Sequence, residues 1–213
     1  MPEEQEILDS ADVAKRAARP ANHAAENRAL RMLAAELEKP DGDVLGKLCD
    51  AAIELCGAHS AGISLIESDG FETVFRWHAV SGRWSKYRGG GMPRNASPCG
   101  TVVDRDEALL MCRPARLFPR ITEVEPQPVE ALLAPFHMLG QPVGTVWVVS
   151  HDESRKFDSE DVRVMESLAQ VAAAAYIARV EINRANESRD EALRANDRLK
   201  RANAKLSAKL GLA

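Results

Sequence analysis

The spacing of apolar residues predicts helices in the first quarter of the chain. Between residues 22 and 39 leucines recur at three- and four-residue spacing, which gives a helix one apolar face, and Pro40-Asp41-Gly42 ends it. A second amphipathic stretch begins after Asp43 and ends at Gly57. Residues 3–19 contain few large apolar side chains, so a helix there needs a surface on which to pack.

In the middle of the chain, apolar and polar residues alternate in a way that predicts strands. Residues 61–67 and 71–80 are joined by Ser68-Asp69-Gly70, which favours a hairpin. Further strands are expected at residues 108–112, 131–138 and 143–150. Residues 81–98 are rich in Gly, Ser, Pro and Arg and are expected to form a long loop. Ser97 followed by Pro98 predicts the start of a short helix.

A heptad pattern runs without interruption from residue 164 to residue 210. Asn196 and Asn203 occupy a positions, where paired Asn side chains favour a parallel two-stranded coil. We therefore expect a parallel homodimer, although the same helix could instead fold back on its own chain. The residues expected in the dimer seam are Leu168, Val171, Ile182, Asn196, Leu199, Asn203, Leu206 and Leu210.

Composition and charge narrow the classes of partner. With 45% apolar residues the chain can bury one substantial core, and its net charge of -4 comes from interspersed acidic and basic residues. Neither nucleic acid nor a membrane surface is expected as a partner. The acidic N-terminus has no apolar signal segment, and the longest apolar run, residues 171–178, is too short to span a bilayer, so a cytoplasmic location is expected.

Three segments support a family resemblance: SPCGTVVDR, VEALLAPFHMLGQPVGTVWVVSHD and RKFDSEDVRVMESLAQVAAAAY. With the order of elements, they resemble the GAF domains of bacterial sensor histidine kinases and phytochrome-like proteins. The resemblance implies an α+β fold with a central antiparallel sheet of five to six strands. The N- and C-terminal helices would lie on one face, and a small-molecule pocket on the other, roofed by about residues 81–130. We accordingly expect a helical extension (1–21), a GAF domain (22–180) and a coiled-coil extension (181–213).

Candidate ligand-binding residues lie in and around the expected roof. Because neighbouring side chains in a strand point to opposite faces, only one of Trp77 and His78 can line the pocket. Arg94, Arg113 and Arg116 offer paired donors for a carboxylate or phosphate, and aromatic side chains lie beside them. An anionic or aromatic ligand is therefore expected. Cys99 is interpreted either as a thiolate activated by the start of a helix or as a buried thiol. The full set is Trp77, His78, Trp84, Tyr87, Arg94, Cys99, Arg113, Arg116 and Phe118.

No cofactor can be named from these residues. Bilin-binding GAF domains usually carry a Cys-His pair before the strand that matches residues 129–136, and PRITEVEPQPVE has neither residue. A covalent bilin is therefore not expected. No metal site is expected either, because the sequence has no closely spaced Cys or His pair of the structural-zinc type.

The sequence favours a dimeric regulatory sensor that binds a small molecule or senses redox state. The signal would pass through the coiled coil to a separate kinase or regulator, and no output enzyme of its own is expected. One alternative is a thiol-dependent reductase related to the free methionine sulfoxide reductases, with Cys99 as nucleophile. The attacking cysteine expected shortly before residue 129 is absent, however. Another alternative is a structural dimer with a filled pocket.

Overall fold

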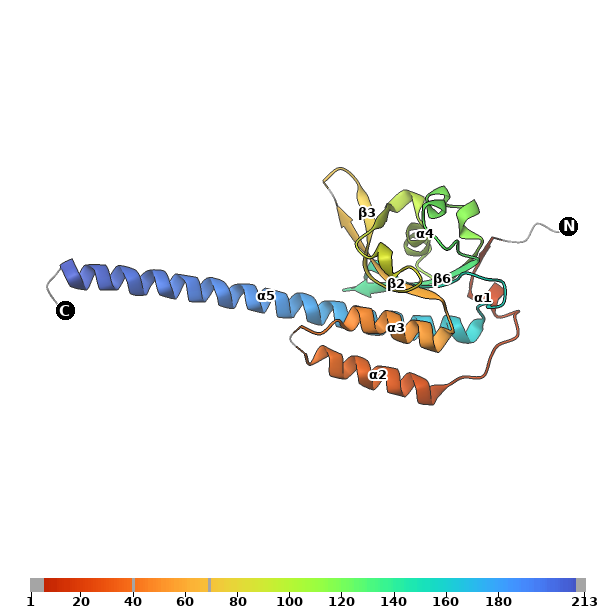
Figure 1. Ribbon diagram of the computed structural model, residues 1–213, viewed down its shortest axis with the longest axis horizontal. Helices are drawn as coiled ribbons and strands as arrows, with labels where there is room; N and C mark the ends of the chain where they lie inside the picture. Colours follow the sequence, from red (N-terminus) through yellow and green to blue (C-terminus); the bar gives the residue numbers. More distant parts are fainter. Residues whose placement is uncertain (1–5, 40, 69, 210–213) are drawn as a thin grey trace. The chain divides into compact units, whose positions relative to one another are not determined.

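The computed structural model describes residues 6–39, 41–68 and 70–209 and confirms an α+β fold with a central antiparallel sheet (Figure 1). The chain divides into two compact units, Met1–Ala175 and Tyr176–Ala213. The strands are β1 (Ile7–Leu8), β2 (Ser60–Ser68), β3 (Thr73–Gly82), β4 (Gly91–Pro93), β5 (Leu109–Cys112), β6 (Glu130–Met138) and β7 (Gln141–Ser150). The helices are α1 (Ser10–Val13), α2 (His23–Leu37), α3 (Val44–Cys56), α4 (Pro98–Arg105) and α5 (Ser159–Lys209), with short 3-10 turns between β3 and β6.

The sheet has seven strands in the order β1-β5-β6-β7-β2-β3-β4. The five longer strands are those that the sequence predicts, and the two hairpins β2–β3 and β6–β7 are both present. Two short strands, β1 and β4, are added at the edges of the sheet. They are too short for apolar alternation to reveal them, so the sequence predicted fewer strands.

The N-terminal segment differs from its prediction. Instead of a helix over residues 3–19, of which 3–5 lie outside the described residues, the chain forms β1 and the four-residue α1. Ile7 pairs with Met111 and Leu8 with Leu110 on β5. The open edge of β5 satisfies the backbone hydrogen bonds of this segment. The N-terminal segment also has too few apolar residues to hold a longer helix in place.

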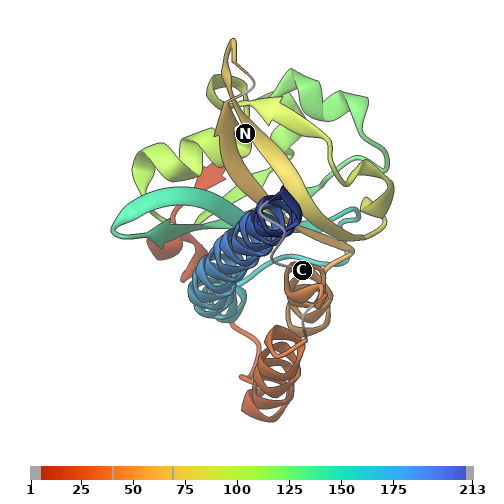
Figure 2. The same cartoon turned by 90° about the vertical axis from the view of Figure 1, so that its left-hand side faces the viewer.

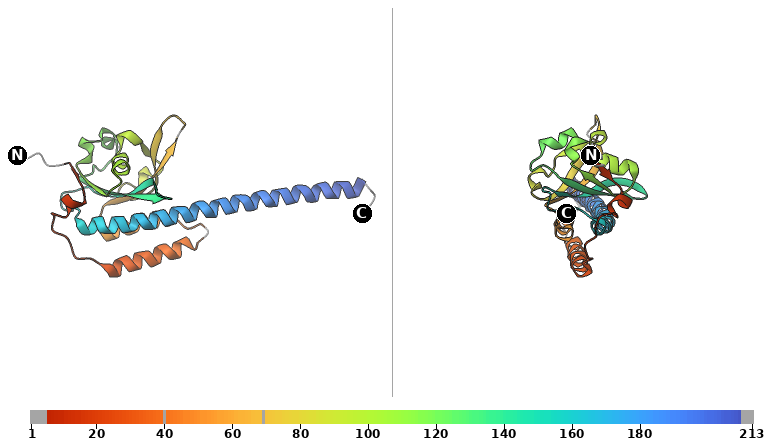
Figure 3. Two further views of the ribbon diagram at one scale, coloured as in Figure 1. Left: turned by 180° about the vertical axis from the view of Figure 1, so that it is seen from behind. Right: turned by 90° about the vertical axis from the view of Figure 1, so that its right-hand side faces the viewer.

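Helices cover one face of the sheet, as predicted. The Asp43 carboxylate caps α3 by accepting from the Gly46 N–H at 3.2 Å, and Gly57 ends the helix in the left-handed conformation at φ +56°. α3 packs on β2 and β3, and α2 packs on the outer side of α3 (Figure 3). Seen end-on, the sheet is strongly curled, and α4 lies on the face opposite α3 (Figure 2).

An ion-pair network that the sequence did not reveal joins the N-terminal segment to the start of α5. The Glu130 side chain is 1% exposed, and the Arg16 guanidinium contacts both of its oxygens at 3.0 and 3.1 Å. Arg16 also donates to the Phe157 carbonyl oxygen at 2.7 Å, and the Phe157 N–H donates to Glu130 at 2.9 Å. Three residues later, Arg19 contacts the buried carboxylate of Asp161 at 2.9 Å.

The prediction of a long C-terminal helix is confirmed over Ser159–Lys209. Leu168, placed in the seam by the sequence, is 3% exposed and packs in the core of its own chain, which leaves it no surface for a partner. Val171 is half-buried, and from residue 181 to residue 206 every described side chain is exposed, including Ile182, Asn196, Leu199, Asn203 and Leu206. Leu210 lies outside the described residues. Among the described residues, none of the helices combines the length and the apolar character that a membrane span requires.

Candidate functional site

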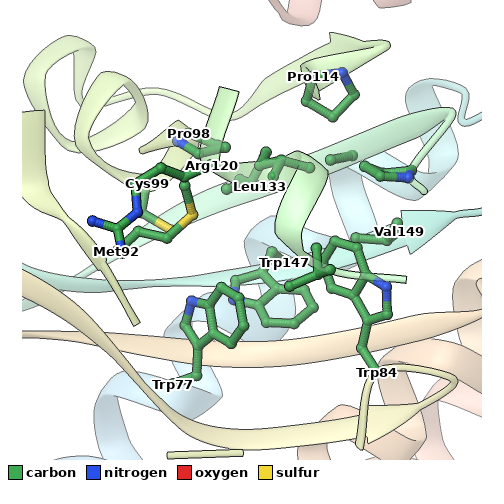
Figure 4. Close-up of a pocket in the computed structure, with 14 residues that line it drawn as sticks. Trp77, Trp84, Met92, Pro98, Cys99, Pro114, Arg120, Leu133, Trp147 and Val149 are labelled. Atoms are coloured by element: carbon green, nitrogen blue, oxygen red, sulfur yellow. The ribbon is translucent and has the colours of Figure 1, made fainter. Parts of the chain in front are cut away.

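All three tryptophans of the chain line one cavity between the sheet and the segments that cover its second face (Figure 4). The cavity has a volume of about 40 Å³, and nearly all of its surface is apolar. Arg120 contributes the single charged side chain among the described lining residues. The complete lining is Trp77, Trp84, Met92, Pro98, Cys99, Pro114, Arg120, Ile121, Val124, Pro128, Ala131, Leu133, Trp147 and Val149.

Small residues on β2 make room for Trp147. Gly62 pairs with Trp147 across β2 and β7, and a Cβ atom added at Gly62 would lie 2.1 Å from the indole ring. The Ser64 hydroxyl accepts a hydrogen bond from Trp147 Nε1 at 2.9 Å. The ring therefore lies against the backbone of β2 and forms the floor of the cavity.

The three indoles form a compact triangle. The ring centroids lie 6.3 Å apart for Trp77 and Trp84, 6.1 Å for Trp77 and Trp147, and 5.8 Å for Trp84 and Trp147. The planes of Trp77 and Trp84 are within 12° of parallel, whereas Trp147 is tilted by 64° to both. Aromatic pairs at these separations attract one another, so the triangle stabilises its own geometry.

The roof of the cavity is fastened by hydrogen bonds to Trp84, which lines the cavity, and to Tyr87, which packs beside it. Trp84 Nε1 donates to the Pro126 carbonyl oxygen at 2.9 Å, and the Tyr87 hydroxyl accepts from the Glu125 N–H at 2.8 Å. A short helix, α4, supplies another part of the roof. As the sequence predicted, Ser97 caps α4 by accepting from the Gly100 N–H at 3.1 Å, and Pro98 occupies its first turn.

His151 connects Gln127 in the roof, Ser60 on β2 and Trp84 through one chain of hydrogen bonds. Its Nδ1 lies 3.1 Å from the Gln127 carbonyl oxygen, which can only accept, so Nδ1 carries the proton. Nε2 then accepts from the Ser60 hydroxyl at 2.8 Å, and that hydroxyl oxygen accepts from the backbone N–H of Trp84 at 3.1 Å. Burial lowers the pKa of His151 below 6.5, and nearby His59 and Arg83 act in the same direction.

Acidification is therefore expected to destabilise the chain through His151. At high pH the ring is neutral in both states, but as the pH falls below 6.5 the unfolded chain takes up the proton before the folded chain does. The melting temperature of the wild type should therefore fall more steeply below pH 6.5 than that of His151→Gln. His23→Gln, at the exposed start of α2, is the control and should follow the wild type. Equal pH dependence in the wild type and His151→Gln would contradict this assignment.

Of the nine residues expected to contact a ligand, Trp77, Trp84 and Cys99 line the cavity. Tyr87 and Phe118 pack against the same apolar cluster without lining the cavity. His78 lies beside Trp77 in β3, does not line the cavity, and pairs with Glu67. This difference between neighbouring residues is the one that strand alternation predicts.

The three predicted arginines do not line the cavity. Arg94 pairs with Asp104, Arg113 lies 3.6 Å from Glu153, and Arg116 lies 3.6 Å from Glu6. Each of these ion pairs holds its guanidinium beside a carboxylate. The cavity therefore lacks the paired donors on which the expectation of an anionic ligand was based.

Cys99 is a buried thiol rather than an activated one. Its side chain is 5% exposed, burial raises its pKa, and its Sγ contacts the Ser64 hydroxyl at 3.6 Å. Cys112 contacts Arg16 and Glu130 and does not line the tryptophan cavity. On β5 it alternates with Leu109 and Met111, which belong to the same apolar cluster as Cys99. The sheet consequently separates the two thiols.

Sequence reasoning missed most of the apolar lining, including Trp147, Leu133 and Val149. Trp147 was recognised only as part of a fold signature. Its place in the cavity follows from the register of β7 against β2, in which alternate residues of β7 face the roof. A sequence pattern shows that residues 145, 147 and 149 share a face, but it does not show which layer covers that face.

A family model for the GAF domain matches residues 40–176, and the chain therefore belongs to the GAF domain family. The expectation drawn from the sequence motifs is confirmed. The GAF domain is a regulatory fold that binds small molecules. In a search of curated proteins, none matches this chain.

Solved structures share the fold at low sequence identity. The GAF domain of an Acinetobacter phosphoenolpyruvate-protein phosphotransferase is 15% identical, with a TM-score of 0.58 over 79% of this chain and 97% of that domain. The GAF-B domain of DevS from Mycobacterium smegmatis is 18% identical, with a TM-score of 0.55 over 68% and 98%. The free methionine-R-sulfoxide reductase from Neisseria meningitidis is 15% identical, with a TM-score of 0.57 over 75% and 93%.

Proposed function

We propose that this chain is a regulatory sensor that binds a small molecule in the tryptophan cavity and passes the signal through α5 of a parallel homodimer. The observation that carries the proposal is the cavity itself, which has an aromatic floor and a roof fastened by hydrogen bonds. Concave apolar sites with a few polar groups are typical of ligand binding. A separate kinase or regulator would receive the signal.

The roof gives a ligand a means of changing the protein. A ligand larger than the cavity must displace the Glu125–Pro126 segment and break its hydrogen bonds to Trp84 and Tyr87. The same segment leads to Gln127 and, through His151, to the end of β7. Binding energy that differs between the closed and open roof would shift the population of the two forms.

The exposed apolar residues of α5 support a homodimer as the means of output. Leu199 is 64% exposed and Leu206 is 56% exposed, and both continue the heptad with Asn196 and Asn203. A helix that is exposed on all sides gains little stability by itself, whereas a heptad seam buried against a second copy does. Because Leu168 is buried in its own chain, the seam of the dimer would begin beyond it.

Native mass spectrometry of the chain purified from its own host tests both parts of the proposal in one measurement. We expect a dimer that retains extra mass from a small molecule. Leu199→Asp should yield monomers, while Leu193→Asp, on a similarly exposed residue next to the seam, should remain dimeric. A monomeric wild type would overturn the coiled coil, and a dimer without added mass that no compound stabilises would favour the structural dimer.

No feature of the cavity favours the reductase. A thiol reductase needs an accessible thiolate, and the burial and raised pKa of Cys99 oppose both requirements. Likeness to a sulfoxide reductase at 15% identity concerns the fold alone. If the wild type reduces free methionine sulfoxide and Cys99→Ser does not, the chain is a thiol-dependent reductase.

A further inference from the structure

We propose that the cavity takes a neutral, single-ring molecule with one hydrogen-bond acceptor, which the indole N–H of Trp77 binds. This inference rests on the proposed function, because it names the class of ligand for the same cavity. It draws on three properties of the described residues: the charge of the lining, the volume of the cavity and the hydrogen bonds of the three indoles.

The lining favours a neutral molecule. Arg120 is the one charged side chain among the described lining residues; it is 51% exposed and lies 3.9 Å from the Glu123 carboxylate. An ionised group buried beside the tryptophans would lose its hydration without a dedicated partner, which is costly. A neutral molecule avoids this cost.

The volume favours a single ring. The cavity of about 40 Å³ is smaller than the roughly 150 Å³ of an engineered apolar cavity that binds benzene. A single ring therefore requires the roof to move outward, and a nucleotide or a tetrapyrrole would require far more space. Trp77 and Trp84 are nearly parallel and offer aromatic surfaces to such a ring.

The indole hydrogen bonds identify the polar contact. The indole N–H of Trp84 donates to the Pro126 carbonyl oxygen, and the indole N–H of Trp147 donates to the Ser64 hydroxyl. Trp77 is only 8% exposed; its backbone N–H donates to the Gly90 carbonyl oxygen, and its indole N–H donates to no group of the described chain. In the view of Figure 4, its nitrogen edge faces the side of the cavity formed by Met92 and Cys99. A ligand acceptor at this position would give the indole N–H a hydrogen bond that the described chain does not supply.

Three ligands that share a six-membered aromatic ring test the inference on the full chain: pyridine, benzene and the anionic benzoate, at a pH where pyridine is neutral. Because all three tryptophans line the cavity, the three indole N–H resonances in a proton–nitrogen NMR spectrum report directly on binding. We expect pyridine to shift the Trp77 resonance, and benzoate to bind more weakly than either neutral ring. Trp77→Phe keeps an aromatic ring and removes the N–H. It should weaken pyridine about 3- to 10-fold and leave benzene within about twofold.

Trp84→Phe is the matched control, because its N–H is already taken by Pro126. It should leave the ratio of pyridine to benzene affinity unchanged, even if both affinities fall. The inference is overturned if Trp77→Phe leaves that ratio unchanged, if benzoate binds most tightly, or if no ring shifts an indole resonance. In each case, a small molecule retained in native mass spectrometry would still support the proposed function. If no molecule is retained, both the proposed function and the inferred ligand class are contradicted.

Discussion

Glu130→Ala is expected to destabilise the chain by about 3 kcal/mol, the low end of the range for breaking a buried ion pair. The Glu130 side chain is 1% exposed, whereas Arg16 keeps 27% of its side chain exposed and can recover some hydration. The substitution also removes the acceptor of the Phe157 N–H, just before α5 begins. Urea unfolding followed by circular dichroism measures the loss.

Two further variants distinguish the buried pair from a general loss of charge. Glu153→Ala removes a carboxylate that is 61% exposed and should lower the urea midpoint much less than Glu130→Ala does. Arg16→Met combined with Glu130→Leu replaces the pair by apolar residues and should be more stable than Glu130→Ala alone. If Glu130→Ala unfolds at the wild-type urea concentration, the network does not stabilise the fold.

Gly62→Ala is expected to destabilise the chain by about 1–3 kcal/mol and to abolish ligand binding in the tryptophan cavity. The added Cβ would lie 2.1 Å from the Trp147 ring, so the ring must move away from β2. The space on its other side is the cavity of about 40 Å³, which a displaced indole would fill. Chemical denaturation measures the stability, and indole NMR titration measures the binding.

The cost should depend on the size of the ring at position 147. In a Trp147→Phe background the smaller ring leaves room for the new methyl group, so Gly62→Ala should cost less than in the wild type. An equal cost in both backgrounds would show that the contact between Gly62 and Trp147 does not determine the effect. Wild-type affinity in Gly62→Ala would show that ligands bind elsewhere.

The helices and long strands were predictable because each carries its own local pattern. α2 begins after Asn22, α3 runs from the Asp43 cap to Gly57, and α4 begins after Ser97, all at residues that the sequence shows. The five longer strands show period-two alternation or an apolar run. β1 was missed because its hydrogen bonds come from β5, about a hundred residues away, and not from any pattern of its own.

The candidate site was only partly predictable. Trp84 and Cys99 lie in the roof that the family resemblance places at about residues 81–130, and Trp77 lies in the predicted strand just before it. The arginines were expected beside the ligand because the sequence does not show which carboxylates are near. In the structure Asp104, Glu153 and Glu6 pair with them outside the cavity.

The sequence by itself determined the family, the order of elements and the heptad of α5, because periodicity, caps and motifs are local properties of the chain. Only the tertiary structure decided that the three tryptophans share one small apolar cavity, that Cys99 is buried and that Glu130 is paired with Arg16. These facts depend on strand register and on contacts between distant segments. They follow from which side chains the folded backbone brings together, and local spacing does not contain that information.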